Sequence, residues 1–205
     1  DDGFETEITD YTVKGTANET IYAWLYTSSE PCLIQSYSDL VLLRDRVNNN
    51  SNGGRWRYGN YKLGYLDSTP LKIIVKNVKW TGIGTLPNPF EGIFDGNSGN
   101  CEVQFNEEGN ITAIDSGLFN YVGDNGTVRN VKVTGWMRPN LNSFGSIARK
   151  NSGTIEDCIF SGTISKVSTV TGGIVGENYG KILRCTLGQG TEIDVISYEN
   201  NKNKG

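Results

Sequence analysis

The second half of the chain repeats one short pattern of apolar and polar residues. Residues 128–133, 155–160 and 182–187 each carry apolar side chains at their first, fourth and sixth positions, with mostly polar residues between them. Each segment follows a turn of the form Asn/Asp-x-Gly, and the glycines of these turns are spaced by 27 residues: Gly99, Gly126, Gly153 and Gly180. A repeat of this length is typical of solenoids and related arrays.

A shorter segment, one small residue followed by two apolar ones, comes before these turns at residues 117–119, 146–148 and 173–175. We expect both kinds of segment to be strands, because no helical period lies between them. The repeat is also shorter than a propeller blade, which takes about 40–50 residues. The sequence therefore predicts an all-β fold: a right-handed parallel β-helix (β-solenoid) of about five coils, with a repeat of about 27 residues.

In such a fold, equivalent positions of stacked coils form ladders of side chains. An earlier copy of the pattern at residues 75–80 predicts two ladders: Val78/Val131/Cys158/Cys185 and Trp80/Val133/Phe160/Leu187. The copy after Gly99 fits worst, so the register around Cys101 stays open. Glycine is expected at the corners because the turns need a positive φ, which Asn and Asp also tolerate.

One helix is predicted before the repeats. Ser36 and Asp39 have the spacing of a capping box, apolar residues follow at helical spacing, and an Asn- and Gly-rich run at residues 48–54 ends the helix. Because a first coil exposes its core and its edge, we interpret this helix as an N-terminal cap. We divide the chain into an extension with a strand near residues 21–26 (1–35), the capping helix with its loop (36–60), the solenoid (61–198) and a polar tail (199–205).

Composition narrows the function classes. The chain has 205 residues, no histidine, 26 glycines and a formal net charge of −4. The lack of histidine excludes mechanisms that use it as a base or metal ligand. Without clustered Lys and Arg we expect no nucleic-acid partner, and no apolar stretch is long enough for a membrane span. We assign no catalytic, cofactor-binding or metal-binding residue and no cofactor.

The four cysteines give one structural hypothesis. Cys158 and Cys185 occupy equivalent positions of neighbouring repeats and are expected to stack. They form either a disulfide or two inward-facing thiols, and we favour free thiols because strand geometry often misdirects the Cβ vectors. For Cys32 and Cys101 the sequence gives no geometry.

Several motifs occur in a fixed order along residues 32–193. They are a helix of type D-L-x-x-L-x-x-x-V-N (39–48), Y-x-L (61–63), W-x-G-I-G (80–84), P-F-x-G-x-F-D-G-N (89–97), Gly-Leu-Phe (117–119) and two G-x-I-x-x-x-N-x-G turns (145–153 and 172–180). This order resembles the bacterial surface proteins with GLUG (Gly-Leu-x-Gly) repeats. Gly176 keeps the final glycine of that repeat, whereas Asn120 and Arg149 replace it. The resemblance implies a secreted or cell-surface, adhesin-like protein and supplies no catalytic residues.

Two carboxylates are candidate site residues. Glu91 and Asp95 lie four residues apart, which would suit a pair for glycan cleavage or a calcium site. We favour the alternative that Asp95 supports the turn before Gly96 and that Glu91 is solvated.

Two aromatic segments are also candidates. Residues 136–139 interrupt the ladder pattern and lead into a polar loop at 140–143. Trp136 beside Arg138 either contacts a sugar or protein or, as we favour, packs at a corner. The run Arg-Trp-Arg-Tyr at residues 55–58 is interpreted as a surface hairpin with cation–π contacts rather than a grip for a polyanion.

Threonines and glycosylation sequons carry weaker signals. Four threonines recur in the repeats, but Lys181 and Ser161 interrupt their ladders, which argues against an ice-binding face: Thr81, Thr127, Thr134 and Thr154. The N-x-[ST] sequons begin at Asn18, Asn49, Asn110 and Asn125. We assign Asn125, which precedes Gly126, to turn chemistry.

These observations lead to a hypothesis about function. We expect a non-catalytic surface module for adhesion or ligand binding, part of a larger secreted or surface protein of bacteria, with an extracellular protein or glycan as partner. The alternatives are a polysaccharide-active lyase or glycosidase of β-helix fold and a passive spacer. An enzyme needs a cleft with two carboxylates, a binding module needs an exposed apolar patch, and a spacer needs neither.

Overall fold

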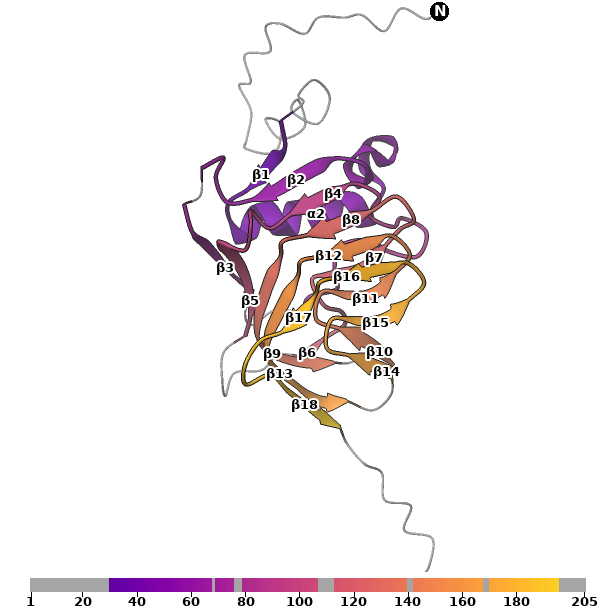
Figure 1. The fold of residues 1–205 in the computed structure, drawn as a ribbon. Coiled ribbons are helices and arrows are strands. Elements are labelled where there is room, and N and C mark those ends of the chain that lie inside the picture. The colour runs from indigo at the N-terminus through magenta and orange to yellow at the C-terminus, as the bar shows by residue number, and fades with distance from the viewer. Residues whose placement is uncertain are drawn as a thin grey trace, which may run out of the picture.

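The computed structural model describes residues 30–67, 69–75, 79–106, 113–139, 142–167 and 170–195. Within these residues the fold is mostly β, with one α-helix, one 3₁₀ helix and eighteen strands. The paired strands are all parallel and form a stack that runs from the indigo to the yellow end of the chain (Figure 1). The predicted strand near residues 21–26 and the predicted tail at 199–205 lie outside the described residues.

Sheet A contains one strand from each level of the stack. Its strands pair in the order β1 (Cys32–Ile34), β2 (Asn60–Leu63), β4 (Ile93–Asp95), β8 (Thr127–Arg129), β12 (Thr154–Glu156) and β16 (Lys181–Leu183). We call each of these strands, together with the elements that follow it up to the next, a layer. Strand β1 belongs to the segment predicted as an extension, yet it pairs with β2 as the first strand of the sheet.

Sheet B follows sheet A in each layer after the first. Its strands pair in the order β3 (Leu71–Val75), β5 (Cys101–Phe105), β9 (Lys132–Pro139), β13 (Ile159–Val167) and β17 (Thr186–Leu187). The far ends of the two longest strands take one more partner each, because β6 (Ala113–Ile114) pairs with β9 and β18 (Glu192–Val195) pairs with β13.

Two smaller sheets lie along the chain between a strand of sheet B and the next strand of sheet A. Sheet C is formed by β7 (Phe119–Val122), β11 (Ala148–Asn151) and β15 (Val175–Asn178), and sheet D by β10 (Ser143–Gly145) and β14 (Val170–Gly172). The segments at 117–118, 146–147 and 173–174, expected to begin strands, are instead bends before sheet C. The strands of sheet C therefore begin two residues later than predicted, at Phe119, Ala148 and Val175.

Strand pairing in the second half of the chain follows the 27-residue spacing. Ile155 pairs with Val128 below it and with Ile182 above it. Earlier steps are longer, because Tyr61 pairs with Phe94 and Phe94 pairs with Val128. The repeat length is thus constant only where the connecting segments are uniform.

The apolar-x-x-apolar-x-apolar segment is two strands rather than one. Strand β8 ends at Arg129 and β9 begins at Lys132, and between them Asn130 has a φ of 55°. This left-handed residue turns the chain from sheet A into sheet B, so Val128 and Val133 belong to different sheets. The same turn recurs at Asp157 and Arg184, which have φ values of 52° and 50°.

The predicted ladder is confirmed for Val133, Phe160 and Leu187, which pair in this order, but its first member, Trp80, is wrong. Val133 pairs with Phe160 on one side and with Val103 on the other, and Val103 pairs with Ile73. Trp80 instead lies buried after β3, where its indole N–H donates to the carbonyl oxygen of Gly117 at 3.0 Å. The register left open around Cys101 is settled by the same pairing, in which Cys101 lies beside Leu71. Val78 lies outside the described residues.

The column of glycines before sheet A follows from close backbone approach. The amide of Thr154 donates to the Gly126 carbonyl oxygen at 2.9 Å, and that of Lys181 to the Gly153 carbonyl oxygen at 2.8 Å. A Cβ on Gly153 would lie 2.2 Å from the Gly126 oxygen. The expectation of a positive φ at these glycines is wrong, since their φ lies outside the left-handed region. Gly99 stands apart from this column, and Gly92 takes its place below Thr127.

The predicted helix is confirmed as α2 (Tyr37–Asn48). Ser36 is its N-cap and accepts a hydrogen bond from the Asp39 amide, while the Asp39 carboxylate accepts from Ser36 and from the Gln35 amide. The helix lies at the indigo end of the stack (Figure 1) and buries Leu40, Leu43 and Val47. Helix α2 thus follows β1 along the chain as β3 follows β2. It takes the place of a sheet B strand in the first layer.

The interior of the stack is a single apolar core. Its largest side chains are aromatic and gather toward the α2 end, where the rings of Phe94 and Phe119 meet edge to face at 5.3 Å. No helix among the described residues is long and apolar enough to cross a membrane. Helix α2 therefore covers the core at the first end of the stack.

Candidate functional site

Side chains that are buried in the fifth layer have exposed counterparts in the last one. Ile155, Phe160 and Ile164 are completely buried. Their pairing partners one layer further on are 40%, 49% and 37% exposed, in the order Ile182, Leu187 and Ile193. The step in exposure therefore marks the place where the apolar core meets the surface. We call these three residues, with the outer edges of β16, β17 and β18, the open end.

The open end also carries unpaired strand edges. Strand β16 pairs with β12, and β17 and β18 pair with β13, but none of the described strands pairs with their outer sides. An edge of this kind presents backbone N–H and C=O groups to any further strand. It therefore combines a row of hydrogen-bonding groups with an apolar centre.

Charges of opposite sign lie on the two sides of the open end. Lys181 begins β16 and Arg184 follows this strand on the sheet A side, and Glu192 and Asp194 belong to β18 on the sheet B side. All four residues are exposed. Arg184 is paired within the chain with Asp157 and Glu156, so the positive charge that the sheet A side offers to a partner is that of Lys181.

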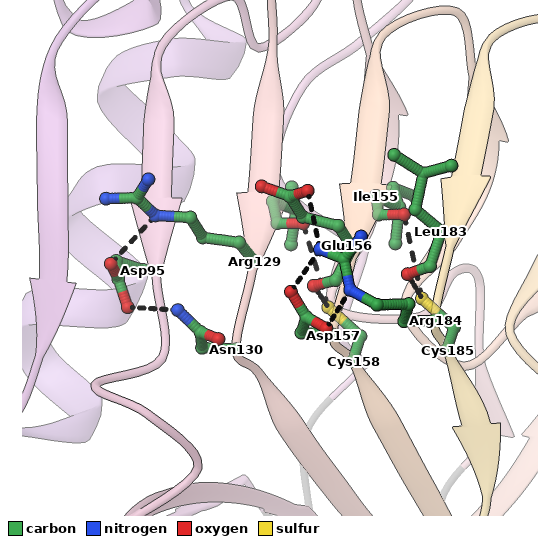
Figure 2. A network of polar contacts seen from close by, with 11 residues as sticks. Asp95, Arg129, Asn130, Ile155, Glu156, Asp157, Cys158, Leu183, Arg184 and Cys185 are labelled. Atoms are coloured by element: carbon green, nitrogen blue, oxygen red, sulfur yellow. Dashed lines mark hydrogen bonds and ion pairs between the residues drawn. The ribbon is translucent and has the colours of Figure 1, made fainter.

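Arg184 ties the last layer to the one before it (Figure 2). Its guanidinium forms two hydrogen bonds of 2.7 Å with the Asp157 carboxylate and one of 3.1 Å with Glu156. These bonds and the positive charge of Arg184 hold the pKa of Asp157 below its usual range, and Asp157 in turn raises the pKa of Arg184. We call these contacts the Arg184 clamp, and they join the left-handed turns at Asp157 and Arg184.

Beside this clamp, Cys158 and Cys185 occupy equivalent positions of the two layers (Figure 2). The Cys158 thiol donates to the Glu156 carbonyl oxygen at 3.2 Å and the Cys185 thiol to the Leu183 carbonyl oxygen at 3.4 Å. All four cysteines of the described chain are free thiols. The neighbouring Cys158 thiol is the main cause that lowers the pKa of Cys185 below its usual value. The neighbouring Cys185 thiol, together with burial, raises the pKa of Cys158. The predicted stacking of these two residues is confirmed, because the residues that follow them, Ile159 and Thr186, are paired. Cys101 lies in β5, beside Leu71 of β3.

The remaining cysteine is isolated from the stacked pair. Cys32 lies in β1 beside Tyr61. Burial, with a smaller contribution from the nearby Asp39 charge, raises its pKa to about 12. Cys32 is therefore an inert core thiol.

The two candidate carboxylates both have structural contacts. Asp95 accepts from the Asn97 amide at 2.9 Å, which confirms its role in the turn, and it also pairs with Arg129 at 2.8 Å (Figure 2). Glu91 is not solvated as predicted: its side chain is only 12% exposed, and it accepts a hydrogen bond from the Asn125 amide at 2.8 Å. Each carboxylate thus holds a loop of the neighbouring layer.

A small depression of about 270 Å³ lies over the outer face of sheet A next to Asp95. It is lined by Pro31, Asn60, Tyr61, Lys62, Ile93, Asp95 and Arg129. Its acidic group is already paired with Arg129. Among the described residues, no group of three or more Cys, Asp or Glu is arranged to hold a metal ion.

The aromatic candidates differ from their predictions. Residues 55–57 belong to the 3₁₀ helix η1 (Ser51–Arg57) rather than to a hairpin, and Trp56 is buried. The cation–π contact is present, since the Arg57 guanidinium lies 5.3 Å from the Tyr58 ring. Trp136 does not interrupt the strand pattern: it lies within β9, is half-buried and pairs with Thr163.

Threonines and sequons fall where their local sequence suggests. Thr127 pairs with Thr154, which pairs with Lys181, so this row ends as predicted. Asn125 is exposed in the turn closed by the Gly126 amide and the Gly123 carbonyl. Asn49 is the C-cap of α2. The sequons at Asn18 and Asn110 lie outside the described residues.

The repeat pattern includes Ile182 and Leu187 of the open end, but it does not show that they form a surface, and Ile193 lies outside the pattern. The available signal was that Ile182 and Leu187 keep the apolar pattern in the last repeat, whereas a terminal capping repeat normally has a polar outer face. Comparisons with protein-family models, with curated proteins and with solved structures gave no match. The functional argument therefore rests on this geometry.

Proposed function

We propose that this chain is a non-catalytic protein-binding module whose open end binds a second copy of the chain. The observation that carries the proposal is the exposure of Ile182, Leu187 and Ile193, whose partners one layer below are fully buried. An apolar centre bordered by free strand edges suits a partner that adds β-strands, which is a recurrent mode of protein recognition.

The proposal includes the architecture of a right-handed parallel β-solenoid. The parallel pairing and the return of the chain to sheet A in every layer support it. Six strands in sheet A favour six coils rather than the five predicted. Right-handedness is supported by the strong general preference for right-handed connections between parallel strands of one sheet.

The self-complementary charges of the open end favour a second copy as its occupant. A two-fold axis between the two sides of this end brings Lys181 of one copy over Glu192 and Asp194 of the other copy, while Arg184 keeps its pairing with Asp157 and Glu156. At the opposite end of the stack helix α2 takes the place of a sheet B strand, and β1 is the edge strand of sheet A there, so the open end of one copy finds edges that match both of its sheets only at the open end of another copy. The contact is therefore tail to tail.

We place the module in a secreted or surface protein of bacteria with an adhesive role. The support for this part is the resemblance of its motifs to GLUG-repeat proteins, from the helix at residues 39–48 to the turn at 172–180. In that setting, tail-to-tail pairing joins two surface-anchored chains.

Sedimentation velocity over a wide concentration range tests the proposal. The wild-type chain is expected to form dimers, and Leu187→Lys is expected to weaken the dimer at least tenfold, because a charge would be buried at the apolar centre without a partner. Leu86→Lys is the matched control, since Leu86 is 71% exposed and lies outside the open end. Ile182→Lys provides a second variant in the same apolar centre.

Two results would contradict the proposal. One is a wild-type chain that stays monomeric at every concentration. A monomeric chain that binds a glycan or another protein would contradict the proposal in the same way. The other is a dimer that Leu86→Lys weakens as much as Leu187→Lys does. Thermal melting of each variant distinguishes loss of the dimer from loss of the fold.

A further inference from the structure

The stacked thiols of Cys158 and Cys185 have a geometry that differs from ordinary core cysteines. Thr186 donates its amide to the Cys158 carbonyl oxygen at 2.9 Å, so the two cysteines are direct neighbours across adjacent layers. Neighbouring strands lie about 4.8 Å apart, and this separation lies within the Cα range of a disulfide.

Both cysteines directly follow the left-handed residues Asp157 and Arg184. They therefore sit at the corner between sheets A and B, where the backbone is not confined to regular strand geometry. The objection that strands misdirect the Cβ vectors applies less strongly at such a corner. At the preceding position of each turn, the Arg184 guanidinium lies 2.7 Å from the Asp157 carboxylate, and this ion pair holds the two turns together.

The two thiols differ in access and in acidity. Cys158 is fully buried, whereas Cys185, in the last layer, is half-buried. The neighbouring Cys158 thiol lowers the pKa of Cys185 below its usual value, which favours the thiolate form of Cys185. The thiolate is the form that attacks disulfides. The accessible thiol is thus also the more reactive one.

We propose that Cys158 and Cys185 are an oxidisable pair that forms a disulfide between the last two layers, with a low-molecular-weight disulfide as the oxidant. The Cys185 thiolate attacks one sulfur of the oxidant, breaks its S–S bond and releases one thiolate. The Cys158 thiol then loses its proton and attacks the Cys185 sulfur, which releases the second thiolate. The protein loses two electrons and two protons, and the oxidant becomes two small thiols.

The disulfide links the last layer to the layer before it, and the last layer has a described neighbour on that side alone. It closes a loop of 27 residues and thereby restricts the unfolded chain. From the loop length, the oxidised protein is expected to melt about 10 °C higher than the reduced protein. This inference concerns a single chain and stands whether or not the open end binds a second copy.

Oxidised glutathione is the probe. After incubation of the folded chain, we expect the thiol count to fall from four to two, the mass to fall by two hydrogen atoms, and a Cys158–Cys185 peptide to appear in a non-reducing digest. Cys158→Ser is expected to keep a glutathione adduct on Cys185, and Cys185→Ser to remain unmodified at Cys158. Repeating the reaction on Leu187→Lys tests the pair with the open end unoccupied.

Three results would overturn the inference. The first is a thiol count that stays at four in the native chain and in Leu187→Lys alike. The second is a wild-type chain that retains a glutathione adduct on Cys185 that Cys158 does not resolve. The third is a set of linked peptides that contain Cys32 or Cys101, which would show that unfolding preceded oxidation.

Discussion

At the scale of single residues, glycine does two separate tasks in this chain. At Gly99 the residue has a φ of 76° and open space around it, so its role is conformational. At Gly153 the φ is ordinary, but a side chain would collide with the carbonyl oxygens of Gly126 and Gly123 at 2.2 and 2.4 Å. The sequence pattern is identical at both positions, so only the stacking of the layers separates the two roles.

Replacing these two glycines by alanine distinguishes the roles. Gly153→Ala is expected to lower the free energy of unfolding by about 3 kcal/mol or more, because the backbone of two layers must separate to admit the methyl group. Gly99→Ala is expected to cost only about 1–2 kcal/mol, from the left-handed conformation alone. Urea denaturation measures both changes, and equal losses would argue against close stacking at Gly153.

Glu91 shows why the polar residues were harder to place than the apolar ones. It lies four positions before Asp95, but its partner is the amide of Asn125 in the next layer. A contact over that distance in sequence has no local signature. Asp95 was placed correctly because its partner, the Asn97 amide, lies two residues away.

At the scale of elements, ion pairs join neighbouring strands of sheet B. Glu102 in β5 binds Lys72 in β3 and Lys132 in β9, each at 2.8 Å. Burial by itself would raise the pKa of Glu102, but the hydrogen bonds and charges of Lys132 and Lys72 outweigh it and hold that pKa below its usual value. One carboxylate therefore links three strands.

The lowered pKa of Glu102 predicts a pH dependence of stability. A carboxyl group that is more acidic in the folded state stabilises the fold above its unfolded pKa, near 4.5, and this contribution is lost as the pH falls through the lower folded value. Glu102→Gln is therefore expected to show a smaller loss of stability between pH 5 and pH 3 than the wild-type chain. Asp124→Asn, in an exposed turn, controls for the change in net charge. Parallel curves for Glu102→Gln and the wild-type chain would contradict the assignment.

Elements were predictable where their signals are local or strictly periodic. Ser36 and Asp39 place the start of α2, and the constant spacing of Gly126, Gly153 and Gly180 places the last strands of sheet A. The pairing of the earlier strands was not predictable because longer connections shift the phase of the repeat, as between Tyr61 and Phe94. The apolar pattern alone then placed Trp80 beside Val133, although Val103 fills that position.

At the scale of the whole molecule, the two ends of the stack differ. Helix α2 covers one end and buries Leu40, Leu43 and Val47 completely. The other end exposes Ile182 and Leu187 and the free edges of their strands. The proposed dimer and the proposed disulfide both concern this second end, the first by covering it and the second by fixing its last layer.

The stacking of layers at a 27-residue interval is the central claim, and methyl–methyl nuclear Overhauser contacts test it most directly. In a sample labelled at Ile, Leu and Val methyl groups, Ile155 is expected to show contacts with both Val128 and Ile182, its pairing partners on either side. Val128 and Ile182, two layers apart, are expected to show none with each other. A spectrum in which Ile155 contacts neither residue would contradict the account.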